Sequence, residues 1–130
     1  MNEGAPNHLH ILLVENHEDS RRYLAMYLEG VGHHVTTAAT VGEALTAAPE
    51  GEYDVLLSDI GLPDGDGWQL LRDAHFSHPI FAIAMSGFGM NSDRERSKQA
   101  GYRRHLLKPI DIEKLDVILA EAAEEAHAGG

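Results

Sequence analysis

VLLSDIGLPDGDG, at residues 55–67, is the stretch of this sequence that decides the fold. Val55, Leu56 and Leu57 have no polar residue between them, which is typical of a strand buried on both faces of a parallel sheet. Asp59 stands at the carboxyl end of this strand, and ligands bind at that edge of open parallel sheets. An aspartate there can instead cap the following turn or helix. The other residues of the chain must show whether Asp59 is a turn or helix cap or a carboxylate with a role in binding or catalysis.

The length and composition indicate one globular domain. The chain has 130 residues, of which 43% are hydrophobic and 24% charged, so an ordinary folded domain is expected despite a formal charge of −11. The excess of 21 acidic over 10 basic residues argues against direct nucleic-acid binding, because phosphate backbones attract clustered Lys and Arg. The absence of cysteine excludes disulfides and thiolate chemistry.

The sequence also lacks the apolar segments that membranes require. No run approaches the roughly 20 apolar residues of a membrane span, and residues 1–8 carry no apolar core of a signal peptide. We therefore expect a soluble, cytoplasmic protein with no membrane insertion. A stand-alone protein and a domain of a longer, membrane-anchored chain are both compatible with this sequence.

Strands and helices alternate five times along the chain. Apolar runs predict strands at residues 9–14, 35–38, 55–59, 80–84 and 105–107. Helical spacing or a capping residue predicts helices that begin near Ser20, Thr40, Asp66, Ser92 and Asp111. This alternation predicts an α/β fold, a flavodoxin-like doubly wound five-stranded parallel sheet of order 2-1-3-4-5 with helices on both faces.

The predicted domain occupies residues 9–126, between a flexible N-terminal tail at residues 1–8 and a flexible C-terminal tail at residues 127–130. Within it, Ser92 and Glu95 form a capping-box signature. The helix that they open has almost no apolar stripe, so we expect it to be loosely held.

Polar side chains follow the central strands at the points where those strands end. They are Glu15, Asn16, Asp59, Ser86 and Lys108. In a parallel sheet these ends lie on one edge, where converging carboxylates repel one another unless a cation lies between them; oxygen ligands suit Mg²⁺ or Mn²⁺. A hydroxyl and an ammonium beside a carboxylate and a metal ion form a receptor for a phosphoryl group. Asp59 is then a candidate nucleophile that forms an acyl phosphate.

Four motifs carry a resemblance to a known family. They are LLVEN after the first strand, DIGLPDGDG around Asp59, AMSG at Ser86 and KPID at Lys108. Over residues 9–126 the chain resembles the receiver domain of two-component response regulators, and its SGFGM stretch is similar to receivers associated with hybrid histidine kinases. The resemblance implies that Asp59 accepts a phosphoryl group from a phosphohistidine on a histidine kinase or a histidine phosphotransfer protein. It implies a phosphorelay signalling domain rather than an enzyme, with catalysis limited to its own phosphorylation and dephosphorylation.

The same resemblance implies a set of metal ligands. Glu15 and Asn16 occupy the positions of the acidic pair, and Asp59 and the backbone carbonyl of Gly61 complete the set for Mg²⁺ or Mn²⁺. The family has an acid where Asn16 stands, so the site is one formal negative charge short. An amide oxygen can still coordinate, but weaker Mg²⁺ binding and slower phosphorylation are expected.

The resemblance also implies phosphoryl-binding and switch residues. Lys108 matches the invariant lysine of the family and Ser86 the switch hydroxyl, and both are expected to hold phosphoryl oxygens. His105 matches the aromatic switch position, although a strand histidine with no mobile role fits this position equally well. Phosphoryl contacts are expected to shift the loop after the fourth strand and the helix that follows. Because 130 residues leave no room for an output domain, we assign the readout to a downstream partner protein or a fused domain.

Two alternatives remain open from the sequence. The first is a degenerate receiver that binds proteins without being phosphorylated, for which Asn16 is the only argument. The second is a Mg²⁺-dependent phosphohydrolase with Asp59 as its nucleophile. This enzyme is disfavoured because Gly61 stands two residues beyond Asp59, where a second acid would serve as the general acid.

Overall fold

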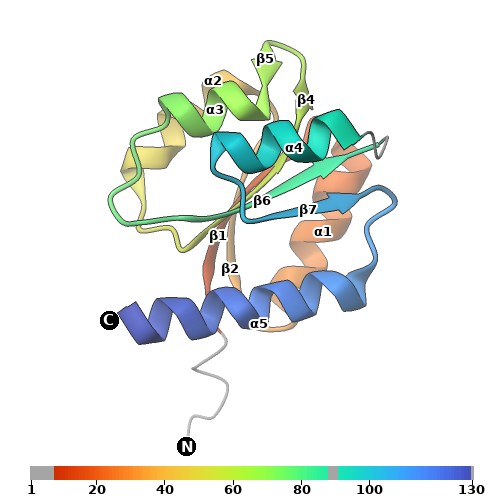
Figure 1. Ribbon diagram of the computed structural model, residues 1–130. Coiled ribbons are helices and arrows are strands. Elements are labelled where there is room, and N and C mark those ends of the chain that lie inside the picture. Colours follow the sequence, from red (N-terminus) through yellow and green to blue (C-terminus); the bar gives the residue numbers. More distant parts are fainter. Residues whose placement is uncertain (1–7, 88–90, 130) are drawn as a thin grey trace, which may run out of the picture.

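Five parallel strands form the central sheet of the protein (Figure 1). The computed structural model describes residues 8–87 and 91–129. The strands are β1 (His10–Val14), β2 (His34–Ala38), β3 (Val55–Asp59), β6 (Phe81–Ser86) and β7 (Arg104–Leu107). They pair in the order β2-β1-β3-β6-β7, which is 2-1-3-4-5 when these five strands are counted along the chain. The predicted flavodoxin-like sheet is therefore confirmed.

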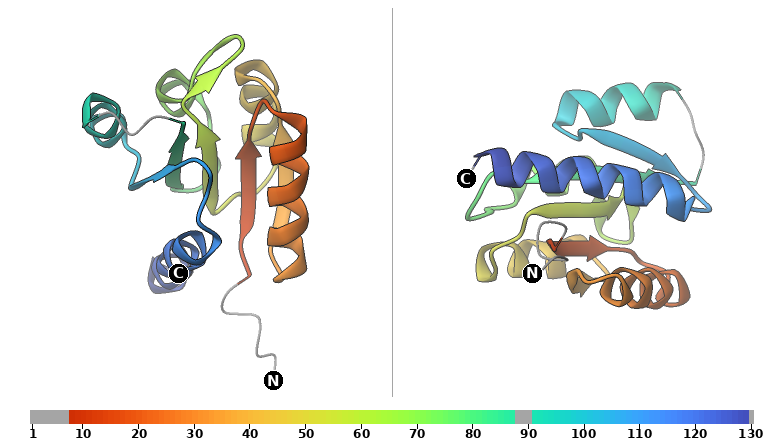
Figure 2. Two further views of the ribbon diagram at one scale, coloured as in Figure 1. Left: turned by 90° about the vertical axis from the view of Figure 1, so that its right-hand side faces the viewer. Right: turned by 90° about the horizontal axis from the view of Figure 1, so that it is seen from below.

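Helices cover both faces of this sheet (Figures 1 and 2). One face packs against α1 (Glu18–Gly30) and α5 (Ile112–Gly129). The other face packs against α2 (Val41–Ala47), the 3₁₀ turn η2 (Ala48–Glu50), α3 (Gly67–Asp73) and α4 (Asn91–Ala100). Each face of the sheet is thus covered, as doubly wound parallel sheets require.

Alternate residues of the central strands point into two separate cores. Leu57 belongs to the core that also contains Leu115 of α5, whereas its neighbour Leu56 belongs to the core that contains Leu70 of α3. All five residues of β3 are buried. Because side chains of a strand alternate between faces, a strand covered on both sides has no position for an exposed polar residue. This explains the uninterrupted apolar run before Asp59.

The loop after Asp59 folds back on the end of β3. It forms a small antiparallel hairpin, β4 (Gly61–Leu62) with β5 (Gly65–Asp66), which the sequence analysis did not predict. Gly67 then approaches the backbone so closely that a Cβ atom added there would lie 2.5 Å from the carbonyl oxygen of Asp59. The Gly67 amide donates to the Ile60 carbonyl at 2.7 Å, and the Tyr102 hydroxyl donates to the Gly67 carbonyl at 2.6 Å. Gly67 therefore fixes the path of the backbone that carries Asp59.

Three of the predicted helix caps are present. Thr40 Oγ1 accepts the Glu43 amide at 3.0 Å, while Glu43 Oε1 reaches back to the Ala39 amide at 2.8 Å. Asp66 and Asp111 each accept an amide proton from the first turn of the helix that follows, at 2.8 and 3.0 Å. The Ser92 prediction is wrong, because α4 begins at Asn91 and Ser92 lies inside its first turn. The S-x-x-E signature marks a cap only when the helix starts directly after the serine.

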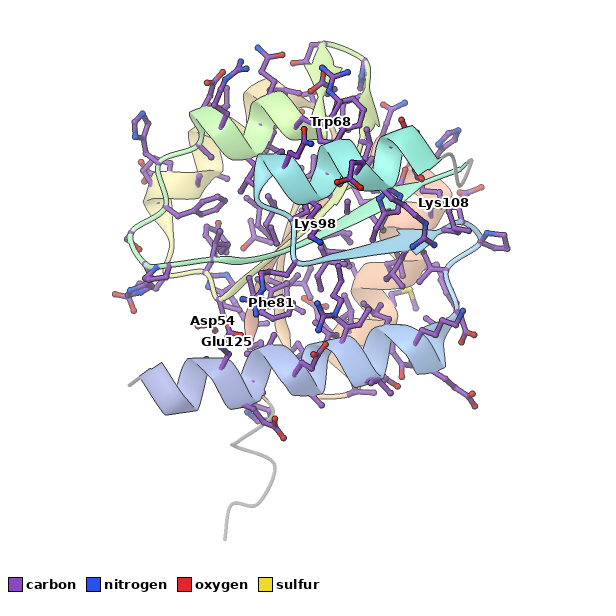
Figure 3. All side chains as sticks on the ribbon, viewed as in Figure 1. Asp54, Trp68, Phe81, Lys98, Lys108 and Glu125 are labelled. Carbon is purple, nitrogen blue, oxygen red and sulfur yellow. The ribbon has the colours of Figure 1, made fainter. Side chains whose placement is uncertain are left out.

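Polar contacts attach α4 to the rest of the domain. Among its described side chains, at residues 93–100, only Ser97 is buried, and its hydroxyl accepts the indole N–H of Trp68 at 2.9 Å. The Arg96 guanidinium lies 4.1 Å from the centroid of the Trp68 ring, so Trp68 joins α3 to α4 (Figure 3). The predicted lack of an apolar stripe thus corresponds to a helix held by a hydroxyl and a cation–π contact.

The predicted flexible tails can be compared with the structure at the C-terminal end but hardly at the N-terminal end. Residues 1–7 of the predicted N-terminal tail lie outside the described residues. At the other end α5 continues to Gly129, so residues 127–129, assigned to a flexible tail, are helical in the structure. The run of Ala and Glu before them has a high helix propensity, which explains the extension. None of the described helices is long and apolar enough to cross a membrane.

A methyl group at residue 67 should be poorly tolerated. We expect Gly67→Ala to lower the free energy of unfolding by about 2 kcal/mol or more, because the Asp59 carbonyl must move to make room. Gly30→Ala is the matched control, since nothing lies within 4 Å of the added Cβ and Ala favours the helix; a change below about 1 kcal/mol is expected. Urea unfolding measures both. Equal stabilities of Gly67→Ala and wild type would contradict the close approach.

Candidate functional site

The polar residues that follow the strands meet at one end of the sheet. Lys108 comes directly after β7 (Figure 3). Its Nζ lies 2.6 Å from Asp59 Oδ1 and 2.8 Å from Glu15 Oε1. The lysine thus joins two carboxylates carried by β3 and by the loop after β1. Both acids are buried: Glu15 is fully inaccessible and Asp59 is 5% exposed. One ammonium group therefore partly neutralises two carboxylates that lie away from water.

An open cleft of about 420 Å³ lies beside this ion cluster. Its lining contains Asn16, His17, Asp59, Ile60, Gly61, Ser86, Gly87, Asp93 and Lys108. The structure therefore brings five of the residues predicted from the sequence, Asn16, Asp59, Gly61, Ser86 and Lys108, to one cavity. Glu15 is buried next to this cavity and is not part of its lining, and it reaches the site through Lys108.

Burial and charge set the protonation of the two acids. Burial raises the pKa of Asp59 to about 6, and the adjacent Glu15 carboxylate adds to that rise while Lys108 opposes it. Burial also opposes ionisation of Glu15, but hydrogen bonds from Asp59, Lys108 and the His17 amide together hold the pKa of Glu15 below its usual range. The Lys108 pKa is raised by its two carboxylate partners despite burial.

Backbone contacts hold the loop that presents Glu15 and Asn16. The His17 amide donates to Glu15 Oε2 at 2.9 Å. Arg21 Nη1 donates to the carbonyl of Glu15 at 3.0 Å and to that of Asn16 at 3.3 Å. His17, Arg21 and Asp93 were not singled out from the sequence. Only the position of His17 beside the acids could have indicated its role, because the other two reach the site from helices.

Ser86 and His105 form a hydrogen-bonded pair at the edge of the cleft. Ser86 ends β6 and His105 lies in the neighbouring strand β7, with Ser86 Oγ and His105 Nε2 2.8 Å apart. Burial lowers the pKa of His105, and Arg94 lowers it further. Both residues are the switch positions expected from the family resemblance, but the residue pattern does not predict this direct contact.

The donor set around the cleft suits a hard divalent cation. A carboxylate of Asp59, the amide oxygen of Asn16 and the carbonyl of Gly61 line the same cavity, and all are oxygen donors of the kind that Mg²⁺ prefers. No cluster of three or more His, Cys, Asp or Glu side chains that could hold a metal occurs in the described part of the chain. Glu18 and Asp19 lie in the first turn of α1 and do not line the cleft. A cation here therefore has fewer anionic ligands than an all-acid site would supply.

Comparison with known proteins now identifies the family. The model of the response regulator receiver domain matches residues 11–120. The chain belongs to this family. It is 34% identical over 118 residues to the KDP operon transcriptional regulatory protein KdpE of Escherichia coli, covering 91% of this chain and 52% of that protein. It is 29% identical over 125 residues to the sensor protein EvgS of Escherichia coli, covering 94% of this chain and 10% of EvgS.

Solved receiver structures agree with this assignment. A CheY-like receiver domain protein from Methanospirillum hungatei superposes with a TM-score of 0.86 at 29% identity, covering 94% of this chain and 98% of that one. The receiver domain of sensor histidine kinase PA1611 from Pseudomonas aeruginosa has a TM-score of 0.80 at 29% identity, covering 89% and 98%. That structure is described with a magnesium ion coordinated in its active-site cleft. The chain spans about half the length of KdpE and a tenth of EvgS.

Removing a negative or a positive charge from the receiver's ion cluster should change the free energy of unfolding in opposite directions. Without divalent cations at pH 7, we expect Asp59→Asn to raise the free energy of unfolding by about 1–3 kcal/mol, because an acid whose folded pKa is raised to about 6 destabilises the fold when ionised. Lys108→Gln should lower it by about 2 kcal/mol or more, since two buried carboxylates lose their cation. Thermal unfolding in a chelating buffer measures both. Destabilisation by Asp59→Asn would contradict this description of the cluster.

Proposed function

We propose that this receiver domain is a Mg²⁺-dependent phosphoacceptor, in which Asp59 takes a phosphoryl group from a phosphohistidine of a histidine kinase or a histidine phosphotransfer protein. The contact between Asp59 and Lys108 at 2.6 Å, at the edge of an open cleft, is the observation that carries the proposal. Reversible modification of this carboxylate is a signalling event, which places the domain in a phosphorelay. The proposed location is the cytoplasm.

The residues of the site have separable roles in the transfer. A carboxylate oxygen of Asp59 attacks phosphorus, the P–N bond to the donor imidazole breaks, and the imidazole leaves with the bonding electrons. With a pKa of about 6, Asp59 is mostly ionised at pH 7, so the nucleophile is available. Lys108 and the Ser86 hydroxyl are the groups that hold the phosphoryl oxygens. Asn16, Asp59 and the Gly61 carbonyl would hold Mg²⁺ or Mn²⁺, with Glu15 beside them, and the ion would neutralise charge on the phosphoryl group.

An apolar groove next to the cleft supports a protein phosphodonor as partner. The groove has a volume of about 450 Å³ and lies between α1 and the segment after β7. Its lining is formed by Ser20, Tyr23, Leu24, Pro109 and Ile110 together with Glu15, Gly87 and Lys108. Tyr23 is 60% exposed and Met26, one turn further along α1, is 70% exposed. Apolar side chains beside a reactive residue are typical of a protein docking surface.

The switch proposal follows from the Ser86–His105 pair and from α4. When Ser86 binds a phosphoryl oxygen, its contact with His105 and the position of the segment leading to α4 are expected to change, which alters a surface for a downstream partner or a fused domain. Residues 88–90 of this segment lie outside the described residues. α4 is the helix through which such a change can be transmitted, because few apolar contacts hold it.

Intact mass measurement tests the phosphoacceptor proposal directly. Incubation with a small acyl phosphate donor and Mg²⁺ should add one phosphate to the wild-type chain and none to Asp59→Asn. The absence of phosphate on wild type, at any Mg²⁺ concentration, would favour the degenerate receiver that binds proteins without phosphorylation, the alternative that Asn16 supports. Rapid multiple turnover of a phosphoester would favour the phosphohydrolase.

The charge at position 16 should control metal affinity. We expect Asn16→Asp to tighten Mg²⁺ binding roughly three- to tenfold and to speed phosphorylation, because a carboxylate would then replace the neutral amide in the lining of the cleft. Glu18→Gln serves as control, since Glu18 is an exposed charge of α1 that does not line the cleft, and it should leave the affinity within about twofold. Calorimetric titration at fixed ionic strength measures the three proteins. Equal Mg²⁺ affinities of Asn16→Asp and wild type would show that the amide of Asn16 does not weaken metal binding.

A further inference from the structure

Ser86 and His105 share a hydrogen bond in which either the serine hydroxyl or the imidazole ring can be the donor. Ser86 Oγ lies 2.8 Å from His105 Nε2, and Ser86 also lines the cleft that contains Asp59. The other ring nitrogen, Nδ1, is buried and has no hydrogen-bond partner in the described part of the chain. All of the polar contact that His105 makes through its ring in this part of the structure is therefore directed at Ser86.

The protonation of the ring decides where the Ser86 hydroxyl points. If Nε2 carries no proton, Ser86 donates to the ring and its hydroxyl hydrogen points toward β7. If Nε2 carries the proton, the ring donates to Oγ, and the hydroxyl hydrogen is directed to another acceptor. Imidazolium always belongs to the second case, because both of its nitrogens carry protons. A phenylalanine at this position would leave the hydroxyl without either constraint.

We propose that His105 is a positioning residue for Ser86: its Nε2–H donates to Ser86 Oγ and thereby directs the hydroxyl hydrogen to an oxygen of the phosphoryl group on Asp59. This inference rests on the proposed phosphoacceptor function. Phosphorylation of Asp59 and protonation of His105 on Nε2 then stabilise each other. If the phosphoryl group stabilises the imidazolium form of His105, thermodynamic linkage requires that protonation of His105 stabilise the phosphorylated state. The phosphorylated state is then more stable at lower pH.

The surroundings of His105 favour the neutral ring over the imidazolium in the unmodified domain. Burial lowers the pKa of His105, Arg94 of α4 lowers it further, and Asp93 of the same helix raises it. On the cleft side stand Ser86 and, one position beyond β7, Lys108. Neutral imidazole therefore prevails at pH 7 until a phosphoryl group adds negative charge to the cleft. Protonation of His105 is therefore expected to differ between the unmodified and the phosphorylated domain.

Nuclear magnetic resonance titration of the His105 ring tests the inference. The probe is beryllium fluoride with Mg²⁺, which mimics a phosphoryl group on a carboxylate. Addition of the probe to wild type should raise the pKa of His105 by roughly one unit and protonate Nε2. In Ser86→Ala the rise should fall to a third or less, because the hydrogen-bond path is gone while the charge of the probe remains. An unchanged pKa in wild type, or an equal rise in Ser86→Ala, would overturn the inference.

The same experiment separates this inference from the proposed function. Probe binding that shifts the signals of residues around Asp59, without any response of His105, refutes the positioning role alone. Failure of the probe to bind at all overturns the phosphoacceptor function and this inference together. Asp59→Asn should abolish binding and serves as the negative control.

The lifetime of the phosphoryl group gives a second readout. Between pH 8 and pH 6 its half-life on Asp59 should lengthen roughly three- to tenfold more in wild type than in His105→Phe, whose ring cannot donate. His105→Gln carries an N–H donor that does not titrate, so it should keep a long half-life at both pH values. Identical pH profiles for wild type and His105→Phe would contradict the linkage.

Discussion

One lysine between two buried carboxylates is the constraint on which the rest of the site depends. Lys108 contacts both Asp59 and Glu15, and neither acid has appreciable access to water. Buried charges are tolerated only when they are paired, so the fold must deliver the three groups to one place. A parallel sheet does this because strand after strand ends at the same edge, and the apolar faces of β3 keep the carboxyl group of Asp59 away from solvent. The same burial that raises the pKa of Asp59 distinguishes it from a solvated surface acid, which agrees with its proposed role as an oxygen nucleophile.

The two faces of the sheet contribute differently to such a site. The face under α1 and α5 is closed by an extended apolar core, and α5 is tied to the residue just before β7 by paired contacts of Arg103 with Glu125. On the opposite face, α4 is attached through Ser97 and Arg96 to the single tryptophan of the chain. Hydroxyl and cation–π contacts can be exchanged for water at little free-energy cost, whereas apolar burial cannot. A change at Ser86 is therefore expected to move α4 more readily than α1 or α5.

The sequence was sufficient for the fold and for most residues of the site, but not for its pairings. Apolar runs without alternation, each followed by polar residues, predicted the strands and hence the edge at which Asp59, Ser86 and Lys108 meet. The two-residue strands β4 and β5 were missed because so short a pairing has no periodicity. Spacing alone could not show that Glu15 lies buried beside the cleft, since that depends on which carboxylate Lys108 reaches. The contact between Ser86 and His105 depends on the register of β6 against β7, which residue patterns do not specify.

Under the proposed function, Asn16 would affect the metal-free state of this cluster as well as its affinity for a metal ion. With an amide at that position, Glu15 and Asp59 together carry at most two negative charges against one on Lys108, so the site without metal is short of cationic charge by at most one. An aspartate there would add a further unpaired carboxylate beside buried acids, and the fold would depend more strongly on a bound cation. Under the proposed function, the amide would stabilise the metal-free cluster at the expense of metal affinity. Lys108 would then hold the two acids in place without Mg²⁺, and the ion would be needed for the proposed transfer step rather than for holding the acids together.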